Sequence, residues 1–193
     1  MTRQSILLFF ALFLVAGIAG AQSKYTTKSF QLLINGTSNV HDWSSKATNV
    51  TVTGDFLVNN NIPEKINNAT VKVQTTSLKS TKDSDLMDER THSTLKADKY
   101  PEITFAFVKV VSTQQSGGET VMVITGNLTL GGVTKATDLT LRIKALPNGD
   151  LQIKGSKKLL MSTHGIKPPS FMLGAMKVAD EVTLTYDVIL KKA

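Results

Sequence analysis

The sequence contains no cysteine and few aromatic residues, which make up 6% of its 193 residues. The absence of cysteine excludes a disulfide framework, thiolate zinc sites, a thiol nucleophile and a lipidated-cysteine anchor. Charged residues are 19% and hydrophobic residues 41% of the chain, so the composition is not that of a disordered protein. Arginine is scarce and no aromatic residues interleave with the basic ones. Nucleic-acid binding is therefore not expected, despite a net charge of +7.

The N-terminal residues have the pattern of an export signal. Arg3 precedes an apolar run from Ile6 to Ile18, and Ala19-Gly20-Ala21 is a small-x-small cleavage pattern. The run is short for a membrane helix of ~20 residues, although an uncleaved anchor is the alternative. We therefore predict a signal peptide over residues 1–21, cleaved between Ala21 and Gln22, and a single domain over residues 22–193. Export without cysteine favours the periplasm, with secretion as the other destination.

After the signal, the chain alternates between apolar and polar residues with a period of two. Leu139, Leu141 and Ile143, for example, alternate with Thr140 and Arg142. This pattern predicts strands with one dry and one wet face. A sheet of about eight such strands closes most easily into an antiparallel up-and-down barrel, because closure removes exposed edges. We expect strands near residues 25–34, 46–58, 67–78, 102–113, 120–130, 136–146, 150–160 and 180–191.

Two segments depart from the alternation. Residues 83–97 contain helix formers with acids at the start and Lys96 near the end, which predicts a short helix. Residues 162–180 indicate a long loop with about one helical turn, and loops of this length are often functional. We expect both segments to lie over the barrel ends, one of them as a lid. A barrel of ~8 strands is either filled by side chains or holds one small ligand, and both outcomes fit the composition.

Four phrases are more specific: Gly36–Trp43, Leu95–Phe105, Ile124–Lys135 and Ala179–Tyr186. Together, and in this order, they resemble the YceI-like family of bacterial periplasmic lipid-binding proteins, over roughly residues 25–191. The resemblance implies a lipocalin-like antiparallel barrel that holds a long apolar chain, such as a polyisoprenoid or an isoprenoid quinone. It also implies a binding protein without catalytic residues.

The alternation assigns residues to the cavity of such a barrel. The predicted mouth residues are His41, Trp43, His164, Phe171 and Met172. Ordinary core packing is the alternative for each wall residue. The predicted wall residues are Val50, Val52, Phe56, Val71, Val73, Phe105, Phe107, Met122, Ile124, Leu128, Leu139, Leu141, Ile143, Leu184, Tyr186 and Val188.

Other constellations favour no chemistry. His41 and Asp42 are adjacent, and adjacent side chains point in different directions, so they form no relay by themselves. Asp85, Asp88 and His92 share a helix face, but a solvated face explains them better than a metal does. The cluster that contains His164 and Met172 is better explained by flexible methionines beside an apolar mouth than by copper. We predict no catalytic residue, no metal and no cofactor.

We therefore expect an exported, non-catalytic protein whose partner is a long-chain apolar lipid of isoprenoid type. The basic balance of the chain is explained first by ordinary solubility from scattered lysines, with transient contact with an anionic membrane surface as the alternative. One alternative is a structural or stress-protective envelope protein with a filled barrel that binds a partner protein. Another is a hydrolase or isomerase acting on a lipid, for which His41 and His164 are the candidate residues. The sequence leaves the identity of the lipid and the oligomeric state open.

Overall fold

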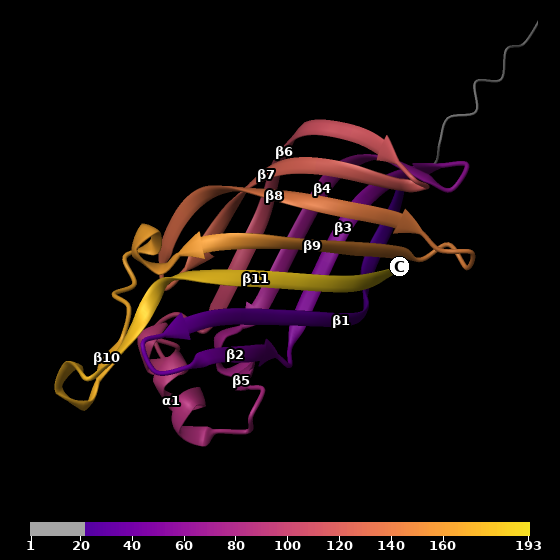
Figure 1. Ribbon diagram of the computed structural model, residues 1–193. Helices are drawn as coiled ribbons and strands as arrows, with labels where there is room; N and C mark the ends of the chain where they lie inside the picture. The colour runs from indigo at the N-terminus through magenta and orange to yellow at the C-terminus, as the bar shows by residue number, and fades with distance from the viewer. Residues whose placement is uncertain (1–21) are drawn as a thin grey trace, which may run out of the picture.

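The computed structural model describes residues 22–193, and the predicted signal peptide and its cleavage site lie outside this range (Figure 1). The described residues contain one α-helix, three 3-10 helices and a sheet of eleven strands. The helix is α1 (Asp85–Thr94). The strands are β1 (Gln22–Ser38), β2 (Asp42–Ala47), β3 (Val50–Asn59), β4 (Ile62–Gln74), β5 (Leu78–Ser80), β6 (Glu102–Ser116), β7 (Glu119–Leu130), β8 (Val133–Ala145), β9 (Leu151–Leu160), β10 (Ser170–Phe171) and β11 (Met176–Lys192). The 3-10 helices are η1 (Thr75–Ser77), η2 (Met161–His164) and η3 (Met172–Gly174).

Eight of these strands form a closed antiparallel barrel. The order around the barrel is β1, β3, β4, β6, β7, β8, β9 and β11, and β11 pairs with β1 to close it. The closing pair is long, and runs from Tyr25 opposite Lys192 to Ser38 opposite Val178. The predicted all-β, lipocalin-like barrel of about eight strands is therefore confirmed.

One predicted strand is in fact two. The segment near 46–58 divides at Thr48 and Asn49 into β2 and β3. Both pair with β1, β3 along its first residues and β2 along its last. Thr48 donates from its backbone N–H to the carbonyl oxygen of Ser77 at 3.0 Å, which fixes the corner between the two strands. The division occurs because β1 is longer than β2 or β3, so these two shorter strands pair with different parts of it.

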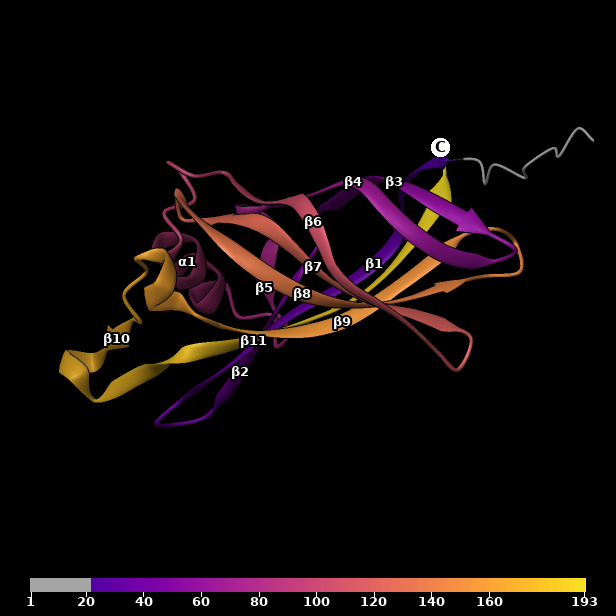
Figure 2. The ribbon, with the colours of Figure 1, turned by 90° about the horizontal axis from the view of Figure 1, so that it is seen from above.

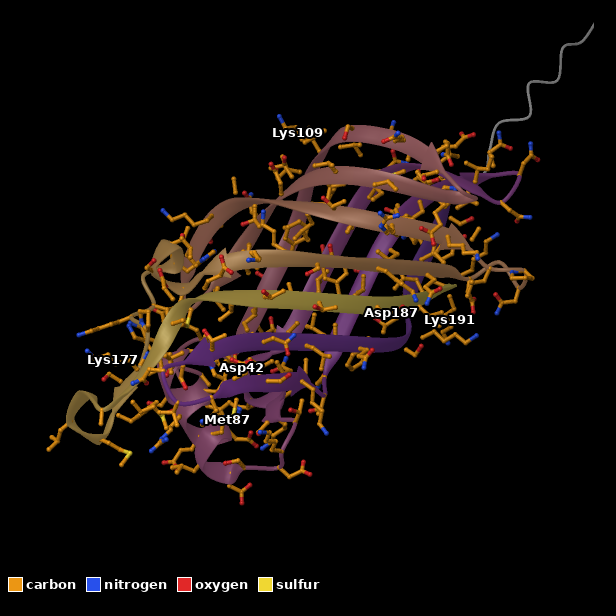
Figure 3. The ribbon with its side chains drawn as sticks, viewed as in Figure 1. Asp42, Met87, Lys109, Lys177, Asp187 and Lys191 are labelled. Atoms are coloured by element: carbon orange, nitrogen blue, oxygen red, sulfur yellow. The ribbon has the colours of Figure 1, made fainter. Side chains whose placement is uncertain are left out.

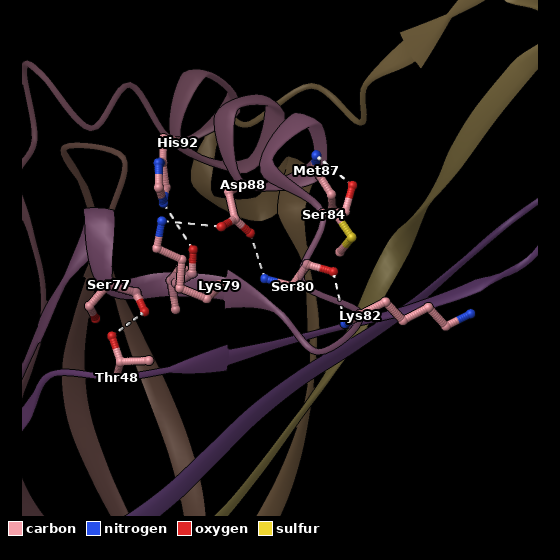
Figure 4. Close-up of polar contacts among 10 residues, drawn as sticks. Thr48, Ser77, Lys79, Ser80, Lys82, Ser84, Met87, Asp88 and His92 are labelled. Atoms are coloured by element: carbon pink, nitrogen blue, oxygen red, sulfur yellow. Dashed lines mark hydrogen bonds and ion pairs between the residues drawn. The ribbon is translucent and has the colours of Figure 1, made fainter.

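The predicted helix is present as α1 and is held over the barrel by β5 (Figure 4). Ser84 caps it by accepting a hydrogen bond from the Met87 N–H at 3.3 Å. Asp88 accepts from the Ser80 N–H at 2.5 Å and pairs with Lys79 at 3.1 Å. Burial opposes the charge on Asp88, but these contacts together hold the pKa of its carboxyl below the usual value. No helix among residues 22–193 is long and apolar enough to cross a membrane.

The two ends of the barrel differ. At one end the interior is filled, and this packed end includes the edge-to-face pair of Tyr25 and Phe56, whose ring centroids are 5.6 Å apart. The other end lies under α1 and under residues 161–176, which include most of the segment 162–180 predicted as a loop with a helical turn; residues from Met176 onward belong to β11. Figure 2 shows α1 and β10 together at this end and the C-terminus at the opposite one. Both covering segments therefore lie over the same end.

Candidate functional site: an apolar barrel cavity

The barrel encloses a cavity of about 550 Å³ beneath α1 and residues 161–176. This volume is within the range of ~300–1,000 Å³ found for small-molecule sites. Phe56 lines the cavity next to the packed end, and the surrounding walls are mainly aliphatic. The barrel is therefore filled at one end and hollow at the other.

Thirteen of the sixteen predicted wall residues line this cavity. They come from β3, β4, β6, β7, β8 and β11, where they alternate with residues on the outer face. Whether a ligand touches them stays a prediction. The thirteen are Val50, Val52, Phe56, Val71, Val73, Phe105, Ile124, Leu128, Leu139, Leu141, Leu184, Tyr186 and Val188.

The other three predicted wall residues lie outside the cavity lining. Met122 and Ile143 have no exposed surface and belong to the packed core. Phe107 is opposite Gly126, just before a register shift in the β6–β7 pair, and lines a separate groove with Lys65 and Val110. Alternation identified the inward face of these strands, but it carries no information about depth along the barrel or about a bulge.

Three of the five predicted mouth residues line the cavity, namely His41, Trp43 and Phe171. The Trp43 ring lies against Gly36 of β1, where the ring leaves no room for a Cβ atom. The other two are placed differently. Met172 is 73% exposed and is not part of the cavity lining, whereas His164 is buried in η2 with 2% exposure.

Helix α1 contributes a side of the site that the sequence prediction missed. Met87, Arg90, Thr91 and Thr94 all line the cavity. Their spacing in the sequence could have indicated this, because these four residues stand at positions i, i+3, i+4 and i+7, which lie on one face of a helix. These positions were overlooked because two of the four are threonines and one is charged, so the face is not apolar.

The ionisable residues of the lining are concentrated near the mouth. His41 lies in the β1–β2 connection and Asp42 begins β2, while Lys82 precedes α1 and Arg90 lies on it. Deeper in the barrel the lining contains Tyr186, whose hydroxyl donates to the carbonyl oxygen of Thr140 at 2.9 Å. Burial raises the pKa of Tyr186 to about 12, so it is neutral at physiological pH.

One buried polar atom in the lining has no partner. Ser45 of β2 is 1% exposed and lines the cavity, and its Oγ makes no hydrogen bond with any described residue. A buried hydroxyl without a partner is unfavourable, since it has lost its contacts with water. Among the described residues of the lining, the Ser45 hydroxyl is thus the one buried polar group that a hydrogen bond could still satisfy.

The residues that might hold a metal are used otherwise. Asp88 is bonded to β5 as described, and His92 contacts the Leu78 carbonyl oxygen through Nε2 at 2.9 Å. Within the described part of the chain, no group of three or more histidine, aspartate or glutamate side chains is arranged to hold a metal ion. Asp88 and His92 therefore attach the helix to β5, whereas Asp85 is exposed.

Solved structures with the same fold are recognised at low sequence identity. BcnA of Burkholderia cenocepacia is 13% identical with a TM-score of 0.66, covering 83% of this chain and 95% of its own. A polyisoprenoid-binding domain from Saccharophagus degradans, implicated in plant cell wall breakdown, is 10% identical with a TM-score of 0.68, covering 90% and 100%. A YceI protein of Campylobacter jejuni is 19% identical with a TM-score of 0.58, covering 82% and 86%.

No curated protein matches the chain. The model of the YceI-like domain family, however, matches residues 22–190, which is nearly the whole described structure. This match agrees with the closed barrel and with the structural neighbours. The chain therefore belongs to the YceI-like domain family, as the phrases in its sequence predicted.

Proposed function

We propose that this protein is an exported lipid-binding protein that holds a long-chain, isoprenoid-type lipid, a polyisoprenoid or an isoprenoid quinone, in its barrel. The observation that carries the proposal is the cavity of about 550 Å³ with aliphatic walls, closed at its inner end by Phe56 and the packed core. Each methylene moved from water into such an interior gains ~0.8 kcal/mol, so a long chain binds there with few polar contacts. The Saccharophagus domain, described as polyisoprenoid-binding, supports this ligand class.

The distribution of polar groups gives the lipid an orientation. The charged side chains of the lining lie near the mouth, and Ser45 contributes a buried hydroxyl that has no partner. An apolar tail is thus best placed toward Phe56, with the polar head group near Ser45 and α1. Polar groups at the mouth select the head, while the length of the cavity selects the tail.

The protein is proposed to bind and not to catalyse. A hydrolase or isomerase needs an acid or a base inside the cavity, at the reacting atoms. His164, one of the two histidines considered for that role, is buried outside the lining, and the other, His41, lies at the mouth and is exposed. The filled-barrel alternative, a structural protein that binds a partner, is disfavoured by the cavity itself.

Export rests on the N-terminal sequence. The predicted signal peptide would bring the protein to the periplasm or outside the cell, where it would meet membranes that carry anionic lipids. Brief contact with such a surface is the simplest source of an insoluble ligand.

The test is native mass spectrometry of the protein purified from a bacterial periplasm after expression of the full chain, followed by solvent extraction. A discrete adduct that extracts as an isoprenoid lipid is expected. In Ile124→Trp the added ring occupies the cavity, and the adduct should be lost while the protein stays folded. Val123→Trp is the matched control, because Val123 is next to it on β7 and outside the lining. An unchanged adduct in folded Ile124→Trp would contradict the assignment of the cavity.

A further inference from the structure

The β10–β11 hairpin ends in two exposed apolar side chains. Its tip, residues 172–175, projects from the hollow end of the barrel (Figures 1 and 2). Met172 is 73% exposed and Leu173 is fully exposed. Both have positive φ angles, 53° and 54°, a conformation that non-glycine residues seldom adopt. Two adjacent, projecting apolar side chains on a surface indicate a binding site for something apolar.

The β1–β2 turn, which is bonded to this hairpin, carries a third exposed apolar residue. Val40 is 62% exposed. Its neighbour Asn39 donates through Nδ2 to the Ala175 carbonyl oxygen and accepts through Oδ1 from the Lys177 N–H, both at 2.8 Å. The turn and the hairpin are thus one unit, and we call Val40, Met172 and Leu173 the apolar rim.

The apolar rim is flanked by positive charge. Lys167 and Lys177 flank the tip in sequence and are exposed, and neither forms an ion pair within residues 22–193. Figure 3 labels Lys177 on this hairpin. The sequence from 161 to 179 contains no acidic residue. Exposed apolar side chains with flanking lysines are the combination that binds the interface of a membrane containing anionic lipids.

The apolar rim also borders the entrance to the cavity. Phe171, Met176 and Val178, which lie in the same hairpin, line the cavity. A long-chain lipid resides in a bilayer and hardly dissolves in water. A bilayer at the rim would therefore place the mouth next to the source of the ligand.

We propose that the apolar rim docks this protein on a bilayer that contains anionic phospholipid. Val40, Met172 and Leu173 enter the boundary between head groups and acyl chains, and Lys167 and Lys177 lie at the phosphates. The mouth then faces the membrane, and lipid moves between bilayer and barrel without crossing water. The role of docking in lipid transfer rests on the proposed lipid-binding function, whereas binding to vesicles is measured independently of whether the barrel holds a lipid.

The experiment is flotation of the purified protein with vesicles of phosphatidylethanolamine and phosphatidylglycerol. In Met172→Ser/Leu173→Ser, vesicle binding should fall at least about ten-fold, because two apolar side chains no longer enter the bilayer. The control is Val108→Ser/Val111→Ser, which removes two other exposed apolar side chains, on β6, that are 53% and 55% exposed. The control should bind vesicles like the unaltered protein. Equal loss in both variants, or no loss in the rim variant, would overturn the proposal.

Charge is tested by Lys167→Gln/Lys177→Gln. Binding to the anionic vesicles should fall about 30-fold, because each lysine near such a surface contributes about five-fold. Binding to vesicles of phosphatidylcholine alone should not change. A charge effect of the same size on the neutral vesicles would count against contact with lipid phosphates.

Two further measurements separate this proposal from its alternatives. Light scattering gives the oligomeric state. If the Met172→Ser/Leu173→Ser variant dissociates a dimer without changing flotation, the rim is a contact between two copies of the protein and the proposal is wrong.

Mass spectrometry gives the bound lipid. A rim variant that keeps its lipid but no longer floats supports docking, whereas an unaltered protein that floats but never holds lipid contradicts only the proposed function.

Discussion

The guanidinium carbon of Arg90 on α1 lies 4.0 Å from the centroid of the Phe171 ring in β10. Both residues line the cavity, although they come from segments that are held independently. Helix α1 is bonded to β5, and the hairpin that contains Phe171 is bonded to the β1–β2 turn. This cation–π pair therefore joins the two segments that cover the hollow end.

Removing this pair should speed the exchange of lipid. A cation–π contact contributes about 0.5–1 kcal/mol at an exposed site, so Arg90→Gln should raise the rate of ligand release about two- to five-fold. Release of a fluorescent isoprenoid analogue, followed by Trp43 emission in stopped flow, measures this rate. Lys99→Gln is the control, because it removes the other cation–π pair, with Tyr100, at 5.4 Å and outside the lining. Equal acceleration in the two variants would show that the Arg90 pair does not retain the ligand.

The Ser45 hydroxyl predicts opposite effects on stability and on binding. Ser45→Ala removes a buried oxygen without a partner, so the ligand-free protein should gain about 1 kcal/mol in its free energy of unfolding. Affinity for a quinone or a prenol, whose oxygen would bond to Ser45, should fall about ten-fold. Affinity for a hydrocarbon of the same length should not change. Urea unfolding and fluorescence titration measure the two quantities, and a loss of affinity shared by all three ligands would show that Ser45 does not contact the head group.

The barrel wall depends on a glycine beneath an aromatic ring. Gly155 of β9 pairs with Tyr186 of β11, whose side chain crosses over it to reach Thr140 of β8. A Cβ atom at this position would collide with the Tyr186 hydroxyl and with the Thr140 carbonyl oxygen. Gly155→Ala should therefore lower the free energy of unfolding by about 1–3 kcal/mol. Ser156→Ala, at the next and exposed position of β9, should change it by less than about 0.5 kcal/mol in the same urea titration.

The strands and their closure were predictable because alternation is a local property of the sequence. The residues of β8, for example, alternate inward and outward wherever β8 sits in the barrel. The division of the segment 46–58 was not predictable, because it depends on how its partner strand β1 shares its length between β2 and β3. Pairing of that kind is a tertiary property.

The sequence predicted which side chains point into the barrel, but it could not predict where along the barrel axis the interior is hollow. Ile124 and Met122 stand two residues apart on the same face of β7, yet only Ile124 reaches the cavity. Which of them meets a void is decided by side chains from other strands, such as Leu151 and Leu190, which help to fill the packed end. The contribution of α1 was missed for a related reason, since a helix face rich in threonine gives no apolar signal.

His164 makes the stability of the fold depend on pH. Burial lowers the pKa of its imidazole from the ordinary value of 6.5, Lys135 acts in the same direction, and the nearby Leu128 peptide group opposes them only in part. The unfolded chain therefore takes up a proton at His164 at a higher pH than the folded chain does. Protonation favours the unfolded state, so the stability contributed by neutral His164 is present above pH 6.5 and is lost as the pH falls below it.

Urea titrations at a series of pH values from 7.5 to 5 test this prediction, and His164→Leu should flatten the decline because no proton is taken up at that position. His41→Gln is the matched control. His41 is exposed at the mouth, so its replacement should leave the decline as it is. If His164→Leu folds and its stability still falls with acid as steeply as that of the unaltered protein, the pH dependence arises from another group and the prediction is wrong.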